Sequence, residues 1–218
     1  MAPTLVLDLD GTLVDSVPDL AAALNRAMAA RGLAGFGRAD VAAMVGDGAR
    51  VLYARACVAR GAPVGEDGFD AFLADYTAHT AVETCVFPGA VEALGLLQGQ
   101  GWRFAVCTNK PAAATHALLE ALSLAPWFAA VGGGDSFPAR KPDPAHLVMT
   151  LAAAGGSAAA AVMVGDHRND VAAAAGAGVP CIFAAWGYGP AAMAEGAAAV
   201  AQGFHDVPAL ALRLVAAA

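Results

Sequence analysis

The sequence predicts an α/β protein, with a doubly wound, Rossmann-like parallel sheet interrupted by an inserted α-helical domain. Three observations lead to this fold class. A short apolar run over residues 4–7 ends abruptly in two acids and a glycine. Residues 18–84 have apolar side chains at helical spacing and little that is typical of a buried parallel strand. From Val86 onward strand-like and helical segments alternate, which is typical of a parallel sheet covered on both faces.

The segments expected after Val86 follow one another along the chain. Strands are predicted at 102–107, 129–132, 162–164 and 181–184, and helices at 112–122, 145–154 and 170–176. The helical block comes directly after the first strand, so we expect it to be an insertion. This organisation gives a core domain of residues 1–15 and 85–218 and a helical domain of residues 16–84.

Composition narrows the class of protein. At roughly 150 residues per domain, 218 residues make one large domain or one and a half. The 12 Lys and Arg against 19 Asp and Glu give a net charge of −7, which disfavours a protein that binds nucleic-acid phosphates. Two charge-free stretches, 147–165 and 171–194, are long enough to span a bilayer. The first is weakly apolar at its centre and the second holds six Gly or Pro residues, so we expect no membrane span.

The spacing of the cysteines and the first residues of the sequence bear on the cellular compartment in which the protein folds. The four cysteines are far apart, and none forms a C-x-x-C pair. That spacing favours buried free thiols in a reducing compartment over a disulfide framework or a zinc site. The first residues carry no basic region and no apolar leader before the first acids. We therefore expect a cytoplasmic protein.

Polar side chains follow the predicted strands at their carboxyl ends, the edge where open α/β sheets bind ligands. They are Asp8, Asp10, Thr108, Asn109 and Asp166, joined by Lys141 from a loop. Carboxylates are the oxygen ligands that Mg²⁺ takes, and Asp8 and Asp166 can supply them. A lone D-x-D is usually a solvated turn, but two charges directly after a buried strand require a partner. The set therefore suits a hard divalent cation together with a phosphoryl group.

Each residue type has a use in phosphoryl transfer. A carboxylate can accept the phosphoryl group as an aspartyl phosphate, and a second acid must protonate the leaving group and later deprotonate water. Two carboxylates two residues apart, such as Asp8 and Asp10, can divide these roles. Charge on the phosphoryl oxygens requires fixed donors and a cation, for which the candidates are Thr108, Asn109 and Lys141.

Other nucleophile and metal motifs are weaker. The five histidines lack the i,i+4 pairing of a zinc helix, and no serine lies in a G-x-S-x-G context. His167 adjoins Asp166, and two interpretations remain open for it: a residue of the pocket, or an exposed loop residue.

Four motifs in this order resemble those of the haloacid dehalogenase superfamily. They are DLDGTLVDS at 8–16, TNK at 108–110, KPDP at 141–144 and GDHRND at 165–170. The inserted helical block resembles the α-helical cap of that superfamily. Further stretches are similar to the phosphoglycolate phosphatase family within it: MVGDGA at 44–49, VFPG at 86–89, GGDSFPARKPDP at 133–144, VGDHRND at 164–170 and WGYG at 186–189.

The resemblance implies a role for each site residue. Asp8 would be the nucleophile and Asp10 the general acid and base. Mg²⁺ would be held by the carboxylates of Asp8 and Asp166 and the backbone carbonyl of Asp10, with support from Asp170. Thr108 and Lys141 would hold the phosphoryl oxygens. The cap loop at 46–50 would close over the leaving group and select it through Gly48 and Arg50, with Arg50 the candidate partner of a substrate carboxylate.

The activity implied is Mg²⁺-dependent hydrolysis of 2-phosphoglycolate, in carbohydrate metabolism, through an aspartyl-phosphate intermediate. The alternative is a capped phosphatase or phosphomutase for another small phosphomonoester such as a sugar phosphate. Outside this chemistry stand a phospho-accepting signalling domain and a non-catalytic binding domain. His167 and Gly189 depart from the residues common in the family and bear on substrate preference. We expect a small-molecule phosphomonoester as substrate, no nucleic-acid or membrane partner, and a monomer or homodimer.

Overall fold

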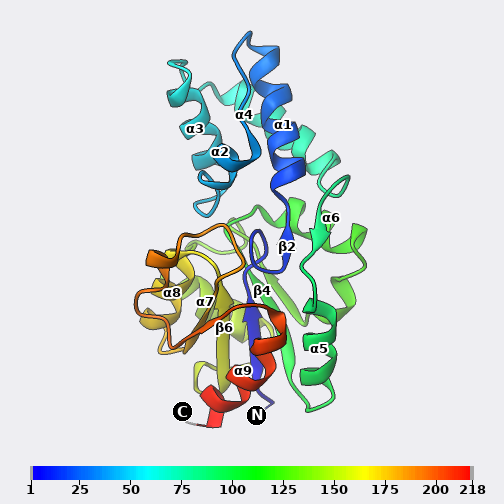
Figure 1. The fold of residues 1–218 in the computed structure, drawn as a ribbon, viewed down its shortest axis with the longest axis vertical. Helices are drawn as coiled ribbons and strands as arrows, with labels where there is room; N and C mark the ends of the chain where they lie inside the picture. Colours follow the sequence, from blue (N-terminus) through cyan, green and yellow to red (C-terminus); the bar gives the residue numbers. More distant parts are fainter. Residues whose placement is uncertain (1, 217–218) are drawn as a thin grey trace.

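The computed structural model describes residues 2–216 and confirms the predicted α/β class. Its centre is a six-stranded sheet in the order β5-β4-β1-β6-β7-β8, with every neighbouring pair parallel (Figure 1). The strands are β1 (Thr4–Leu7), β4 (Arg103–Cys107), β5 (Ala130–Gly132), β6 (Ala161–Gly165), β7 (Cys181–Ala184) and β8 (Ala199–Ala201). The first strand along the chain thus lies in the interior of the sheet. Its carboxyl end is flanked by those of β4 and β6.

Helices cover both faces of the sheet. They are α5 (Ala90–Gln98), α6 (Ala112–Ala121), α7 (Pro144–Ala153), α8 (Arg168–Gly176) and α9 (Val207–Ala216). Because side chains alternate along a strand, Leu5 and Leu7 pack into the cluster that includes α5, α6 and α9. Val6 packs on the other face with residues of α7 and α8. The sequence did not predict β8 or α9, which lie beyond the last strand it indicated.

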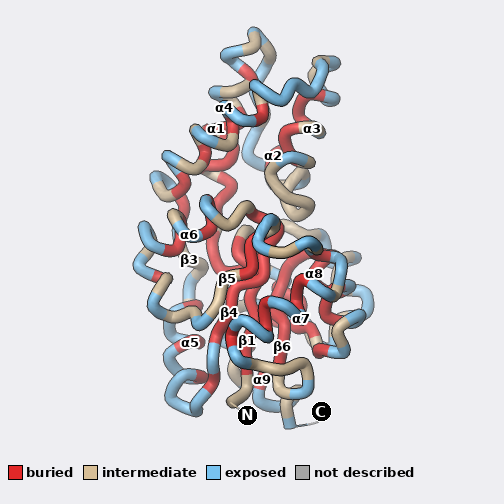
Figure 2. The backbone as a smooth tube through the Cα atoms, turned by 180° about the vertical axis from the view of Figure 1, so that it is seen from behind, coloured by how far each residue is buried: buried red, intermediate tan, exposed pale blue. Residues whose placement is uncertain are grey.

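Four helices form a separate unit beyond the carboxyl edge of the sheet, which we call the cap (Figures 1 and 2). They are α1 (Val17–Ala30), α2 (Arg38–Ala42), α3 (Ala49–Ala59) and α4 (Glu66–Ala78). The cap has its own apolar core, in which the ring of Phe72 stacks on Tyr53 and Tyr76 at centroid distances of 5.6 and 6.2 Å. As predicted, no parallel strand occurs between residues 18 and 84.

Two adjacent chain segments connect the cap to the core. The short strands β2 (Val14–Asp15) and β3 (Cys85–Val86) pair antiparallel, so the outgoing and returning chains lie side by side. Asp19, in the first turn of α1, accepts hydrogen bonds from the returning chain. Its Oδ2 accepts from the backbone N–H groups of Val82 and Thr84, both at 2.8 Å, and from the Thr84 hydroxyl at 2.7 Å. Asp19 therefore fastens the start of α1 to the returning segment.

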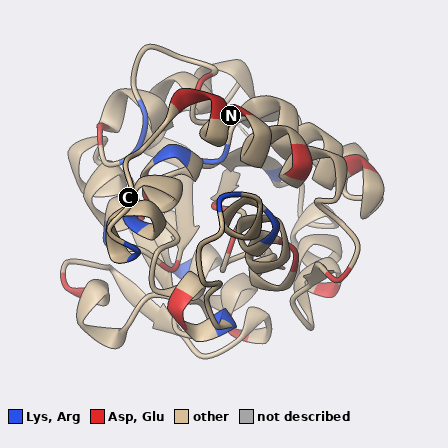
Figure 3. Ribbon diagram, turned by 90° about the horizontal axis from the view of Figure 1, so that it is seen from above, with Lys and Arg blue, Asp and Glu red and all other residues tan. Residues whose placement is uncertain are grey.

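The cysteines and the charge-free stretches can now be placed. Cys57, Cys107 and Cys181 are buried free thiols as expected, but Cys85 is exposed, because it lies in the short strand β3 of the connection rather than in a core strand. Within residues 2–216, no helix has both the length and the apolar character needed to cross a membrane. Seen from the cap end, basic and acidic residues are interspersed among uncharged ones (Figure 3).

Replacing Asp19 with Asn should destabilise the fold in a pH-dependent way. Burial raises the pKa of Asp19, but the hydrogen bonds from Thr84, Glu83 and Val82 outweigh burial and hold it below its ordinary value of 3.8. The stabilisation is therefore complete above about pH 3.9, the pKa of an unfolded Asp, and is lost as the pH falls through the folded value. We expect Asp19→Asn to lower the free energy of unfolding at pH 7 by about 2 kcal/mol, measured in urea.

The matched control is Asp75→Asn, which removes an exposed ion pair with Arg26 and should change the free energy of unfolding by less than about 1 kcal/mol. The difference in free energy of unfolding between the wild type and Asp19→Asn should become smaller toward pH 3. A deficit of the same size at pH 3 and pH 7 would contradict the role given to the Asp19 carboxylate.

Candidate functional site

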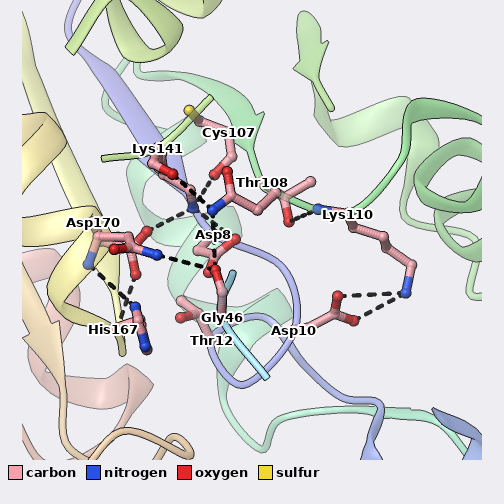
Figure 4. A network of polar contacts seen from close by, with 12 residues as sticks. Asp8, Asp10, Thr12, Gly46, Cys107, Thr108, Lys110, Lys141, His167 and Asp170 are labelled. Carbon is pink, nitrogen blue, oxygen red and sulfur yellow. Dashed lines mark hydrogen bonds and ion pairs between the residues drawn. The ribbon is translucent and has the colours of Figure 1, made fainter. Parts of the chain in front are cut away.

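One buried ammonium joins three elements at the carboxyl edge of the sheet (Figure 4). Lys141 Nζ lies 2.9 Å from Asp8 Oδ1, 2.6 Å from Asp170 Oδ1 and 2.5 Å from the carbonyl oxygen of Cys107. These partners follow β1, belong to α8 and end β4, respectively. Burial disfavours the ammonium, but Asp170 and Asp8 outweigh burial and raise the pKa of Lys141. Lys141 is therefore a permanent cation at the centre of the site.

The loop that carries Lys141 is held by its backbone. The Lys141 N–H donates to His146 Nδ1 at 3.1 Å, and Asn109 Nδ2 donates to the Lys141 carbonyl at 2.9 Å. Burial and the charge of Lys141 lower the pKa of His146 to about 4, so its ring is neutral at pH 7. With Nδ1 accepting, Nε2 carries the hydrogen and donates to the Gly133 carbonyl at 3.1 Å. This role was not predictable from the sequence, because His146 lies in none of the motifs identified in the sequence.

Three buried carboxylates lie close together, and two of them, Asp8 and Asp170, pair with Lys141. One oxygen from each of Asp8, Asp166 and Asp170 lies within 4.8 Å of the others. Thr12 Oγ1 donates to Asp166 Oδ1 at 2.9 Å and the Tyr188 N–H donates to Oδ2 at 2.8 Å. Burial and the charge of Asp8 raise the pKa of Asp166 to about 6. Burial raises the pKa of Asp170 as well, with Asp8 and Asp166 adding to the effect and Lys141 opposing it.

This group of side chains fits a divalent cation. The three carboxylates have a single ammonium to balance them, so negative charge is in excess, and that ammonium is the one polar partner of buried Asp8 Oδ1 among the described residues. Hard oxygen donors of this kind are the ligands of Mg²⁺. The Asp10 carboxylate is not a member of the group. Only its backbone carbonyl was expected to take part.

A second buried ion pair lies on the other side of Asp8 (Figure 4). Lys110 Nζ is 3.1 Å from Asp10 Oδ1 and 3.4 Å from Oδ2, and it donates to the hydroxyl of Tyr76 in the cap. Burial disfavours the charge, but Asp10 and Tyr76 outweigh it and raise the pKa of Lys110. Sequence reasoning gave Lys110 no role, although its place directly after a strand-end Thr-Asn pair was a usable signal.

A cavity of about 40 Å³ lies between cap and core beside this pair. Its walls include Asp8, Asp10, Thr108, Asn109 and Lys110 from the core, and Leu20, Gly48, Leu52 and Tyr76 from the cap. The volume corresponds to a few water molecules. Gly48 thus lies in the wall of the cavity, and the carboxylates of the core face it.

Arg50 does not line this cavity. Its guanidinium lies 2.7 Å from Glu66 Oε2 and 4.1 Å above the ring of Phe69, and half of its side chain is exposed. Ala49 and Leu52 are the residues of α3 that line the cavity, and each helical residue turns the side chain by about 100°. Arg50 is therefore directed toward α4, which corrects the expectation that it lies beside the substrate.

Asn109 and Thr108 differ in whether their side-chain hydrogens remain available to donate to a ligand. Asn109 Nδ2 donates to the carbonyls of Gly46 at 3.0 Å and Lys141 at 2.9 Å, so the amide joins cap loop and core loop. Both hydrogens of this amide are thus engaged, and the role of Asn109 in binding phosphate stays a prediction. Thr108 Oγ1 accepts from the Lys110 N–H at 3.2 Å, which leaves its hydroxyl hydrogen available.

His167 and Gly189, the two residues that differ from those common in the resembled family, both make close contacts. His167 is buried, caps α8 by accepting from the Asn169 N–H at 3.2 Å, and packs against the cap loop. A Cβ on Gly46 would come within 2.6 Å of the His167 ring. The interpretation as an exposed loop residue is therefore wrong. A Cβ on Gly189 would come within 1.9 Å of the Asp166 carbonyl oxygen, so this arrangement requires glycine there.

Comparisons with known proteins show similarity that extends over both the cap and the core. A model of haloacid dehalogenase-like hydrolases matches residues 2–178. A curated phosphoglycolate phosphatase of Caulobacter vibrioides is 42% identical over 210 residues, covering 94% of this chain and 89% of the relative. One of Rhodospirillum rubrum is 44% identical over 216 residues, covering 95% and 90%. The crystal structure of "a predicted phosphoglycolate phosphatase" from Haemophilus somnus superposes with a TM-score of 0.87 at 31% identity, covering 96% and 97%.

Mg²⁺ should stabilise the fold, because it would offset the excess negative charge of the three carboxylates. At a hundred times its dissociation constant a ligand adds about 2.7 kcal/mol, which corresponds to a rise in Tm of roughly 5–10 °C for a domain of this size. Asp166→Asn removes one carboxylate and should shrink that rise, whereas Asp75→Asn should retain it. A rise of equal size in Asp166→Asn, in calorimetry with and without Mg²⁺, would contradict the assignment of the metal site.

Proposed function

Because the chain belongs to the haloacid dehalogenase-like hydrolase family, we propose that it is a Mg²⁺-dependent phosphatase that hydrolyses 2-phosphoglycolate to glycolate and phosphate. The observation that carries the proposal is the position of Lys141 between Asp8 and Asp170, with Asp166 beside them, at the ends of parallel strands. The relatives named phosphoglycolate phosphatase support the substrate, since the similarity includes the cap.

The residues divide the chemistry. Asp8, Asp166 and the Asp10 carbonyl would hold Mg²⁺, with Asp170 in support, and the bound ion would supply positive charge to the phosphoryl oxygens. Lys141 Nζ adds a fixed ammonium beside the Asp8 carboxylate. The Thr108 hydroxyl donates its free hydrogen to a phosphoryl oxygen. This preorganised donor stabilises the negative charge on that oxygen.

The reaction takes two displacements. An Asp8 carboxylate oxygen bonds to phosphorus while the bond between phosphorus and the ester oxygen breaks, and Asp10 gives its proton to the departing glycolate oxygen. A water molecule then attacks phosphorus and transfers a proton to Asp10. The bond to Asp8 breaks, which releases inorganic phosphate and restores both carboxyl groups. The same Asp10 thus acts as acid in one step and as base in the next.

The relatives favour a small leaving group. Their name, phosphoglycolate phosphatase, supports 2-phosphoglycolate over a sugar phosphate or a phosphomutase reaction. The net charge of −7 supports a free small molecule rather than nucleic acid as the ligand. Three buried thiols support a reducing, cytoplasmic location. A monomer or homodimer remains our expectation for the assembly.

The test is steady-state phosphate release with Mg²⁺ on 2-phosphoglycolate and a panel of sugar and alkyl phosphates, with Asp8→Asn as the blank. We expect kcat/KM for 2-phosphoglycolate to lead the panel by about a hundredfold, or roughly 2.7 kcal/mol of transition-state discrimination. Asp8→Asn should lack turnover because it has no nucleophile.

The other outcomes separate the alternatives. A lead by another ester would retain the chemistry and overturn the substrate. A single stoichiometric phosphorylation of the protein, without repeated release of phosphate, would indicate a phospho-accepting signalling domain. No turnover of any ester by a folded, Mg²⁺-binding protein would indicate a non-catalytic binding domain.

A further inference from the structure

We propose that Lys110 determines substrate specificity, its ammonium receiving the carboxylate of the substrate next to Tyr76 of the cap. This inference rests on the proposed function, because it concerns the carboxylate end of 2-phosphoglycolate. It replaces Arg50, whose guanidinium is engaged by Glu66 outside the cavity.

Charge inside the cavity supports the assignment. Lys110 is the one Lys or Arg side chain among the described residues that line the cavity, and 2% of its side chain is exposed. Its ammonium offsets the charge of Asp10 in the same wall. A carboxylate that entered beside Asp10 without a cation would be repelled and would lose its hydration, so a cation is required at this place.

The shape of the substrate points to the same atom. In 2-phosphoglycolate a single methylene separates the ester oxygen from the carboxylate. The ester oxygen must lie beside Asp10, which protonates it, and Lys110 Nζ is 3.1 Å from Asp10 Oδ1. The carboxylate therefore reaches the neighbourhood of Lys110 without any movement of the core.

The Lys110 ammonium has one N–H donor that its two partners do not use. An ammonium carries three N–H bonds. The carboxylate of Asp10 and the hydroxyl of Tyr76 are its two partners, so one donor remains for a ligand in the cavity. Tyr76 itself is fixed by stacking on Phe72 within the cap core. The carboxylate site is thus complete only when the cap is against the core.

The test compares 2-phosphoglycolate with ethyl phosphate, in which a methyl group replaces the carboxylate. Lys110→Met keeps the length of the side chain and removes the charge. We expect it to lower kcat/KM for 2-phosphoglycolate about a hundredfold and that for ethyl phosphate by less than about fivefold. The control Arg50→Met, which removes a cation outside the cavity, should leave the ratio of the two substrates unchanged.

Equal losses on both substrates would overturn the proposal, since Lys110 would then only position Asp10. If Lys110→Met does not fold, Lys110→Gln is judged by the same ratio, because its amide can still donate to Asp10. Lys110→Arg, which keeps the charge, should retain a preference for the carboxylate.

Binding of glycolate, followed by ligand-observed NMR with phosphate and Mg²⁺ present, separates this inference from the proposed function. If the wild type hydrolyses other esters and not 2-phosphoglycolate, the proposed function fails. Glycolate signals that are lost in Lys110→Met and kept in Arg50→Met would still support a carboxylate site. Glycolate that binds both variants equally, or does not bind the wild type, would overturn it.

Discussion

The buried ammonium of Lys141 is the interaction on which the site depends. The parallel strands bring Asp8 and Asp166 to one edge, and α8 adds Asp170, so three carboxylates share a buried region. Charges taken out of water are tolerated only when they are paired and hydrogen-bonded. Lys141 is the partner of two of the three, and its own loop is held by His146 and Asn109. The remaining excess of negative charge makes this edge suitable for a cation.

The cap covers part of this edge and leaves a partly open cavity between cap and core. On one side Asp19 at the start of α1 accepts hydrogen bonds from the segment that returns to the core. On the other side the cap loop is held by the core: Asn109 and Asn169 both donate to the Gly46 carbonyl, at 3.0 and 3.3 Å. Between these attachments Tyr76 meets Lys110. In the proposed function, the contact between cap and core selects the leaving group, and residues of the core carry out the phosphoryl transfer.

The difference between contacts within the core and contacts between cap and core explains what could be predicted from the sequence. The core strands and the acids after them were predictable, because apolar runs and the polar residues at their ends are local patterns. Arg50 was misplaced because its direction depends on the phase of α3 relative to the cavity. Lys110, Tyr76 and His167 gain their roles from packing between cap and core, which leaves no periodicity. The strands β2 and β3, with two residues each, are too short to produce a pattern.

A double-mutant cycle on Lys141 and Asp170 tests the central claim most directly. The free energy of unfolding would be measured in urea without Mg²⁺ for Lys141→Met, Asp170→Asn and the double variant. Lys141→Met alone should lose about 3–5 kcal/mol, because it leaves buried carboxylates without their cation. The double variant should be less destabilised than the sum of the single variants by more than about 1 kcal/mol. Additive losses would contradict the view that Lys141 is what makes these buried carboxylates tolerable.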